Sequence, residues 1–219
     1  MNTASYLDAL LTGAATTITL TCSSLALATV FAFAAGISLY ARHTLMKPFA
    51  SAYVGVFRGT SLLVQFFWLY YALPLLGFSM SPMATGIIAL ALNSGAYGAE
   101  VVRGAMQAVS KQQLEAARAL NFTSAYTLRK IVLPQAVVEM MPSFSSLAVQ
   151  NLKDTALVSM ITIADLAYKA QELRNLTQDT VPIYGLTLLL YFAMALILMF
   201  AMRALERKFD KSGLRGARA

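Results

Sequence analysis

A long uncharged stretch near the N-terminus limits this chain to few kinds of fold. No Asp, Glu, Lys, Arg or His occurs from Ala9 to Ala41, and about 20 apolar residues suffice to cross the hydrocarbon core of a bilayer. A cleavable signal peptide is the alternative. Met1–Tyr6 carries no basic residue, however, and the apolar run exceeds the hydrophobic region of a signal peptide. We therefore expect a membrane-spanning helix here.

The rest of the chain has the composition of an integral membrane protein. Hydrophobic residues make up 58% and charged residues 12%, whereas soluble domains average roughly 25% charged. We predict an all-α integral membrane fold in which residues 1–219 form one domain. The five transmembrane helices that we expect are Ala9–Ala41, Ser61–Leu76, Met83–Val102, Ala136–Leu152 and Ile183–Met202. The fourth is the least apolar, and Pro142 interrupts it.

The distribution of Lys and Arg predicts the orientation of these helices. Basic residues concentrate in three segments and are sparse between the fourth and fifth spans, which hold only Lys153, Lys169 and Arg174. The three basic segments are the first loop (Arg42, Lys47, Arg58), the central loop (Arg103, Lys111, Arg118, Arg129, Lys130) and the tail (Arg203, Arg207, Lys208, Lys211, Arg215, Arg218). Because cytoplasmic loops carry the positive excess, we expect the N-terminus outside and the C-terminus in the cytoplasm. The net charge of +7 then reflects topology and attraction to membrane lipid, and no nucleic-acid partner is expected.

The central loop, about 104–134, is polar and rich in helix formers. Ser110 can cap a helix through Gln112–Leu120, and Asn121 stands where a left-handed residue can end it. Thr123 or Ser124 can cap a second helix, Ala125–Leu133, which Pro134 helps to stop. We therefore predict two short helices joined by a tight turn.

This predicted helix pair has a surface suited to docking. Ala116 and Ala117 form a face small enough to enter a groove, while Glu115, Arg118 and Arg129 offer charge for orientation. A flexible linker would not need so much helix propensity. We interpret the loop as a rigid element that binds another protein.

Four segments of the chain resemble one known family. Residues 115–121 (EAARALN) followed by 131–134 (IVLP) resemble the EAA coupling loop of permease subunits of bacterial ATP-binding-cassette (ABC) importers. The polar amino-acid uptake subfamily, of histidine and glutamine type, is the most similar. Its signatures resemble residues 58–65 (RGTSLLVQ), 95–103 (GAYGAEVVR) and 152–159 (LKDTALVS).

Three positions depart from the family pattern. Asn121 stands where the family usually has Gly, but Asn also tolerates the left-handed conformation. Ser61 replaces a usual Pro, which affects the rigidity at the entry to the second span. Ala156 replaces a common Ser, a change that bears on substrate preference.

The resemblance implies a type I ABC importer permease fold and a translocation mechanism by alternating access. It implies a complex of this chain with a second permease subunit, either a related chain or another copy, two cytoplasmic ATPase subunits and an extracytoplasmic solute-binding protein. The location would be the bacterial inner membrane. The coupling residues would be Glu115, Ala116, Ala117, Arg118, Asn121, Arg129 and Pro134.

The solute implied by the resemblance is small and polar, most often an amino acid. Residues 93–100 (NSGAYGAE) and 155–162 (TALVSMIT) are most similar to permeases for ectoine and hydroxyectoine, cyclic amino-acid derivatives. Polar side chains within spans usually face a bundle interior or a cavity. On that basis the candidate substrate path comprises Gln65, Asn93, Tyr97, Glu100, Gln150 and Asn151.

The alternative to solute contact differs among these side chains. For Asn93 and Gln150 it is hydrogen bonding between helices, and for Glu100 it is a structural ion pair with Arg103, three residues on. The external segment Thr162–Val181 is expected to form a short amphipathic helix with Asp165, Glu172 and Asp179 directed to water.

Other functions find less support in the sequence. An ion-coupled secondary carrier would typically show inverted repeats with broken spans in both halves, and we see no such symmetry. No catalytic residues and no metal site are expected; His43, the only histidine, should be exposed in the first loop. The chain lacks a phosphate-binding GxxxxGK[ST] motif, so ATP and Mg²⁺ would be bound by the partner ATPase and not by this chain.

Overall fold

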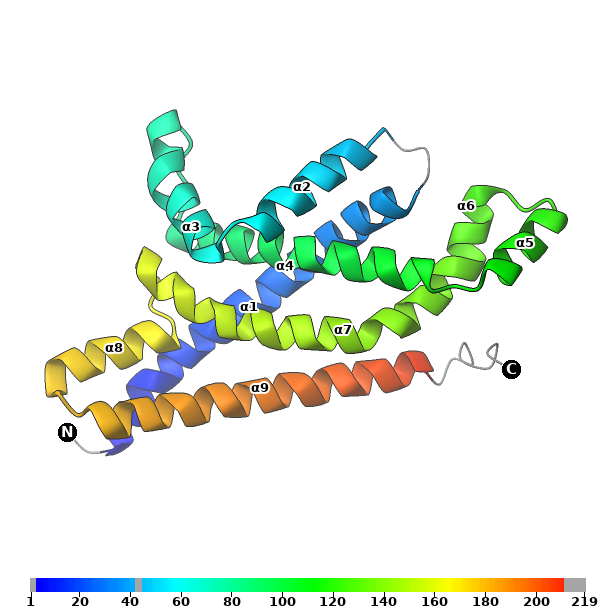
Figure 1. Cartoon of the computed structure of the whole chain (residues 1–219). Helices are drawn as coiled ribbons and strands as arrows, with labels where there is room; N and C mark the ends of the chain where they lie inside the picture. The colour runs from blue at the N-terminus through cyan, green and yellow to red at the C-terminus, as the bar shows by residue number, and fades with distance from the viewer. Residues whose placement is uncertain (1–2, 42–44, 211–219) are drawn as a thin grey trace.

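The computed structural model describes residues 3–41 and 45–210, which form helices and no strand (Figure 1). The helices are α1 (Thr3–Tyr40), α2 (Lys47–Gly59), α3 (Leu62–Phe67), α4 (Pro82–Gln107), α5 (Lys111–Ala119), α6 (Ser124–Thr127), α7 (Leu133–Asp154), α8 (Leu166–Thr177) and α9 (Thr180–Asp210). Arg42, His43, and the tail cations from Lys211 onward lie outside the described residues. The predicted all-α class is confirmed for the described part of the chain.

The centre of the bundle is a close packing of α1 against α4. Glycines permit this approach, because a Cβ added at Gly98 would lie 2.7 Å from the Ala32 Cβ, and one at Gly95 would lie 2.8 Å from the Phe31 Cβ. Small residues at such contacts are typical of membrane helices. α7 packs on α4, and α9 packs on α7, so the bundle presents α5 and α6 at one end and α8 at the other (Figure 1).

Within the described ranges, three helices are long and apolar enough to cross a membrane: Tyr6–Tyr40, Ser124–Ile161 and Thr180–Lys208. The bent pair Lys47–Gly59 and Leu62–Leu76 qualifies as a fourth if its halves count as one span. α4, which contains the predicted third span Met83–Val102, is not in this set. It lies in the centre of the bundle, and its Gly, Asn93, Glu100 and Arg103 make it less apolar in composition than the three helices above. Five spans therefore remain a prediction.

The second predicted span is not one straight helix. α2 and the helical segment Leu62–Leu76 meet at an angle of 106°, and Thr60 and Ser61 between them are extended. We call residues 59–61 the elbow. The segment beyond it consists of α3, a π-helical turn (Trp68–Ala72) and a 3₁₀ turn (Leu73–Leu76), and it projects from the bundle in Figure 1.

The prediction that Pro134 stops the second loop helix is wrong. α6 continues through a π-helical turn (Leu128–Val132) into α7, with Pro134 in the first turn of α7. Within a continuous helix Pro134 cannot supply the backbone N–H that the preceding turn would use, and the π turn before it, which is wider than an α turn, accommodates this gap. The side-chain amide of Gln135 also donates to the Ile131 carbonyl at 2.9 Å. Likewise α7 runs through Pro142 without ending.

The segment Thr162–Val181 forms the predicted short helix, α8, but Asp165 does not point to water. Its side chain is 0% exposed and caps α8 by accepting a hydrogen bond from the Tyr168 N–H at 2.9 Å. The Tyr191 hydroxyl donates to its other oxygen at 3.2 Å. Burial raises the pKa of the Asp165 carboxyl to about 6. Glu172 and Asp179 are exposed, as expected.

Candidate functional site

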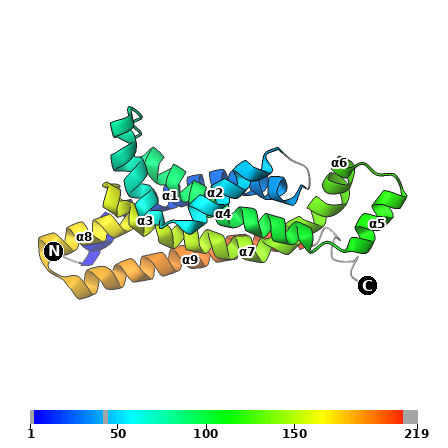
Figure 2. The ribbon, with the colours of Figure 1, turned by 45° about the horizontal axis from the view of Figure 1, so that its top comes forward.

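The central loop folds into the two predicted helices, which lie together at one end of the bundle (Figure 2). α5 ends at Ala119, and Asn121, two residues further on, has a left-handed φ of 54°. The Asn121 N–H donates to the Arg118 carbonyl at 2.9 Å, and the Phe122 N–H donates to the Ala117 carbonyl at 3.0 Å. This pair of bonds is a Schellman motif. The expected left-handed turn at Asn121 is confirmed.

Side-chain bonds fix the second helix and tie the first to the bundle. Thr123 caps α6 by accepting from the Tyr126 N–H at 3.3 Å. Ser110 occupies the N-cap position of α5 but makes no side-chain bond to its backbone. The Gln135 amide donates to Gln113 Oε1 at 2.7 Å, which links α5 to the base of α7. The helix pair is therefore tied by a side-chain bond to the base of α7.

The exposed face of this helix pair differs in part from the expected one. Glu115, Ala116, Arg118 and Arg129 are exposed. Ala117 is only 2% exposed, so it packs within the loop and offers no docking surface. Adjacent residues of an α-helix point about 100° apart, and the sequence does not show which of the two alanines faces outward.

Sequence reasoning missed three large apolar side chains on the same loop. Leu120, Phe122 and Tyr126 are all exposed, and the Phe122 and Tyr126 rings meet edge-on with centroids 4.7 Å apart. Aromatic residues are enriched at protein interfaces. The signal available in the sequence was their position at the turn of an otherwise polar loop.

Two predicted substrate-path amides hold the elbow in place. Gln65 Nε2 donates to the Phe57 carbonyl at 3.0 Å and to Thr60 Oγ1 at 2.8 Å. Asn93 Nδ2 on α4 donates to the same Phe57 carbonyl at 3.0 Å and to Gln65 Oε1 at 3.2 Å. Both side chains are buried. They satisfy backbone carbonyls that the break between α2 and α3 leaves without a helical partner.

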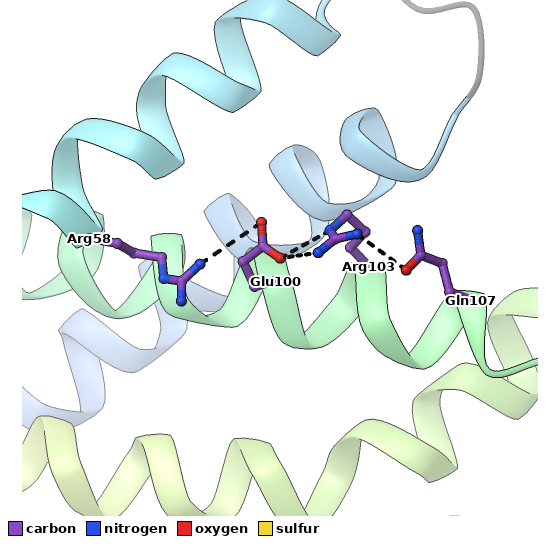
Figure 3. Close-up of polar contacts among 4 residues, drawn as sticks. All are labelled: Arg58, Glu100, Arg103 and Gln107. Carbon is purple, nitrogen blue, oxygen red and sulfur yellow. Dashed lines mark hydrogen bonds and ion pairs between the residues drawn. The ribbon is translucent and has the colours of Figure 1, made fainter.

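A row of charged and polar side chains follows α4 next to the elbow (Figure 3). Arg103 Nε donates to Glu100 Oε2 at 3.0 Å, Arg103 Nη2 donates to the same oxygen, and Arg103 Nη1 donates to Gln107 Oε1 at 3.2 Å. Arg58, from the end of α2, lies 4.0 Å from Glu100 Oε1. We call Arg58, Glu100, Arg103 and Gln107 the charge ladder. The structural ion pair between Glu100 and Arg103 is thus present.

Tyr97 adjoins the charge ladder, one turn before Glu100 on α4. The Arg58 guanidinium lies 5.2 Å from the centre of the Tyr97 ring, a distance suited to a cation–π contact. Tyr97 is exposed, whereas Asn93 one turn earlier is buried. The predicted polar face of the third span therefore divides into a buried amide and an open aromatic and acidic part.

Asn151 does not lie on an open path. Its side chain is 0% exposed, its Oδ1 accepts from the Ser24 hydroxyl at 2.9 Å, and its Nδ2 donates to Ser94 Oγ at 2.8 Å. These bonds join α1, α4 and α7. Because both amide groups are engaged within the bundle, Asn151 connects helices in this structure.

Gln150, the next residue back along α7, faces the surface. It donates to Asp154 Oδ1 at 2.8 Å and lines a groove of about 450 Å³ between α7 and α9. Lys153, Arg203 and Glu206 also line this groove. The described residues contain no group of three His, Cys, Asp or Glu side chains placed to hold a metal ion.

Comparison with known proteins identifies the family to which this arrangement belongs. Residues 28–211 match the model of the binding-protein-dependent transport system inner membrane component. The chain is 52% identical over 207 residues to the probable amino-acid ABC transporter permease protein y4tF of Sinorhizobium fredii, covering 92% of this chain and 87% of that protein. It is 36% identical over 180 residues to the L-cystine transport system permease protein TcyB of Bacillus subtilis, covering 80% and 76%.

Solved structures agree with the sequence comparisons. The crystal structure of an amino acid ABC transporter with histidines contains a chain that superposes with a TM-score of 0.85 and 32% identity, covering 94% of this chain and 96% of that chain. An inward-facing MetNI methionine ABC transporter superposes with a TM-score of 0.76 at 19% identity, covering 91% and 95%, which shows the shared fold. The predicted permease fold is confirmed. This chain belongs to the family of inner membrane components of binding-protein-dependent transport systems.

Proposed function

We propose that this chain is the membrane-spanning subunit of an ATP-driven importer for an amino acid or an amino-acid derivative, and that it works by alternating access. The observation that carries the proposal is the exposed helix pair α5–α6. It presents Glu115, Ala116 and Arg118 at one end of the bundle and is rigidly capped at its turn.

The connections of this helix pair suit the transmission of force. α5 follows α4 after a three-residue connection, Ala108–Ser110, and α6 runs without interruption into α7. A movement of a docked ATPase would therefore reach two central helices together. A ligand shifts a conformational equilibrium only through contacts that differ between the states, and a rigid docked element provides such contacts.

The proposed setting is a multi-pass protein of the bacterial inner membrane. It has five spans, an external N-terminus and a cytoplasmic C-terminus, and α4 serves as the third span. The partners are an ATPase dimer that binds ATP and Mg²⁺, a second permease subunit and an external solute-binding protein. Asn121, Arg129 and Pro134 support the docked helices. Gln65, Asn93 and Asn151 hold helices in place beside the solute path, and Gln150 acts along it.

The names of relatives support an amino-acid-like solute. The transport systems of the Sinorhizobium and Bacillus relatives are named for amino acids and L-cystine, and another relative is the arginine permease ArtQ of Bacillus subtilis. Ectoine, suggested by residues 93–100 and 155–162, is one solute within this chemical class. An ion-coupled carrier is the alternative function.

The proposal is tested by ATPase activity of the complex in nanodiscs. We expect loaded binding protein to stimulate the wild-type complex and to lose this effect with Glu115→Arg while the complex stays assembled. Glu115→Gln keeps the side-chain size and should retain more stimulation than the reversed charge. Unchanged stimulation with Glu115→Arg would contradict a coupling role for Glu115. Absence of ATPase activity with every candidate partner would favour the carrier.

A further inference from the structure

Arg58 directly precedes the elbow but makes none of the hydrogen bonds that stabilise it. The Phe57 and Thr60 carbonyls accept from Gln65 and Asn93. Within the described residues, the Arg58 guanidinium meets only the Tyr97 ring and the more distant Glu100 carboxylate. Its side chain is 42% exposed, and its five N–H donors are therefore available to a ligand.

The two oxygens of Glu100 have different surroundings. Oε2 accepts both bonds from Arg103. Oε1 faces Arg58 at 4.0 Å, beyond the 2.7–3.2 Å of a direct N–H···O hydrogen bond. The carboxylate is 27% exposed. Arg103 thus fixes the orientation of Glu100 and leaves one oxygen open beside the Arg58 cation, as Figure 3 shows.

Glu100 lies within the predicted third span, Met83–Val102, and Arg58 lies beside it in the last turn of α2. Ionisable groups within spans are costly and tend to pair closely or to line a cavity. Two side chains that served only to bind each other would gain most from a direct bidentate contact. Arg58 and Glu100 instead stand side by side, with the Tyr97 ring next to the cation.

We propose that Arg58 and Glu100 bind the two charged groups of a zwitterionic solute. This inference rests on the proposed import function. The Arg58 guanidinium donates two hydrogen bonds to the solute carboxylate in a forked contact, and Glu100 Oε1 accepts a hydrogen bond from the solute ammonium or amidinium. A zwitterion with neighbouring charges matches this side-by-side pair, whereas a neutral solute would leave both charges unpaired. The solute side chain lies outside this contact.

The surrounding residues position this pair. Gln65 and Asn93 hold the end of α2 against α4 and so fix the position of the Arg58 backbone. Arg103 fixes the orientation of the Glu100 carboxylate. The competing interpretation is that the charge ladder only fixes the elbow. That interpretation predicts equal weakening for every solute when Arg58 changes, so the test must separate solutes by their charged groups.

The first step of the test identifies the transported solute. Proteoliposomes holding the complete complex and its binding protein are assayed for ATP-driven uptake of radiolabelled L-glutamine, L-arginine, L-cystine and ectoine. Equilibrium binding of the transported solute is then measured on the membrane complex in nanodiscs without binding protein. Competitors are its carboxamide, which lacks the negative charge, and, for an amino acid, its α-hydroxy acid, which lacks the positive charge.

The expected result is that each substitution removes the preference for one charged group of the solute. The wild-type complex should prefer the acid over its carboxamide by about tenfold to a hundredfold. Arg58→Gln should weaken the acid by that factor and bind the two equally. Glu100→Gln should likewise lose the preference for the ammonium over the hydroxyl. Arg174→Gln, on α8 at the other end of the bundle, should change neither preference.

Each remaining outcome has a definite meaning. Equal weakening of acid and carboxamide by Arg58→Gln overturns the proposal and leaves the import function standing. If Arg58→Gln does not assemble, Arg58→Lys keeps the charge without the fork and should reduce the preference. A wild-type complex that does not distinguish acid from carboxamide overturns the proposal by itself. Uptake of none of the four solutes overturns the amino-acid function, and the zwitterion site with it.

Discussion

The elbow and the central loop, about 104–134, differ in how their polar side chains are paired. At the elbow, the amides of Gln65 and Asn93 are buried and bonded to backbone carbonyls of the same chain. On the central loop, Glu115 and Arg118 are exposed, and the described structure gives neither of them a side-chain hydrogen bond or an ion pair. The elbow is complete within one chain, whereas the loop presents groups suited to another.

This difference indicates how the two regions contribute to function. A buried polar group left without a partner costs about 1–3 kcal/mol, so changes at the elbow should act mainly on stability. Exposed substitutions typically change stability by about 0.5 kcal/mol or less. Changes on the loop surface should therefore act on coupling while the fold persists.

Gly95→Ala should lower the unfolding free energy more than the other substitutions. A smaller loss would contradict the contrast between buried and exposed positions. The added Cβ would lie 2.8 Å from both the Phe31 Cβ and the Tyr53 hydroxyl, and Tyr53 donates to the Leu92 carbonyl. We expect a loss of about 3 kcal/mol in unfolding free energy from overpacking, measured by SDS titration. Gly104→Ala, on the same helix with nothing within 4 Å, should be neutral or stabilising.

Asn93→Ala should follow, with a loss of about 2 kcal/mol in unfolding free energy. It removes one donor to the Phe57 carbonyl and leaves buried Gln65 Oε1 without its hydrogen bond from Asn93. The matched change is Gln150→Ala on the exposed face of α7, which we expect to shift stability by less than about 0.5 kcal/mol. Equal losses in the two variants would contradict the buried role of Asn93.

Asp165 is a buried polar group at the far end of the bundle, and its contribution to stability should depend on pH. Its pKa of about 6 in the fold lies above the ordinary value near 3.9. The stabilisation linked to its protonation is therefore complete below about pH 4 and is lost as pH rises through 6. Asp165→Asn retains a capping side chain but cannot ionise. Between pH 5 and 7.5, wild type should lose about 1 kcal/mol more stability than the variant. Parallel pH profiles would refute the buried carboxyl.

The turn at Asn121 should show the smallest effect. Its φ of 54° suits Gly as well as Asn, so Asn121→Gly should change unfolding free energy by less than about 0.5 kcal/mol. Asn121→Val should be worse by about 1 kcal/mol and should reduce stimulated ATPase activity by displacing α5 from α6. Full stimulation in the Val variant would show that the turn does not need to be rigid.

Local signals in the sequence predicted the turn and the cap of the central loop. The left-handed turn at Asn121 and the cap at Thr123 depend on residues within a few positions of each other. Pro134 was misjudged because a π turn, which has no clear sequence signal, carries the helix past it. The face of Ala117 was misjudged because the angle of α5 on the bundle is set by contacts such as Gln135 with Gln113.

The elbow and the buried polar bonds could not be predicted in the same way. The 106° bend is stabilised by Asn93, which lies 36 residues from the carbonyl it binds. Asn151 meets Ser24, 127 residues away. A sequence shows that such side chains are polar within apolar runs, but it does not show which of them are satisfied inside the chain and which face a cavity.

Cysteine cross-linking at two adjacent alanines tests the docking claim most directly. In a Cys22→Ser background, which removes the only cysteine, exposed Ala116→Cys and buried Ala117→Cys are compared in membranes with the partner ATPase. We predict that a short bifunctional reagent joins the ATPase subunit to the Ala116→Cys chain and that the Ala117→Cys chain gives little product. Absence of the product at Ala116→Cys, in a complex that still hydrolyses ATP, would contradict docking through α5.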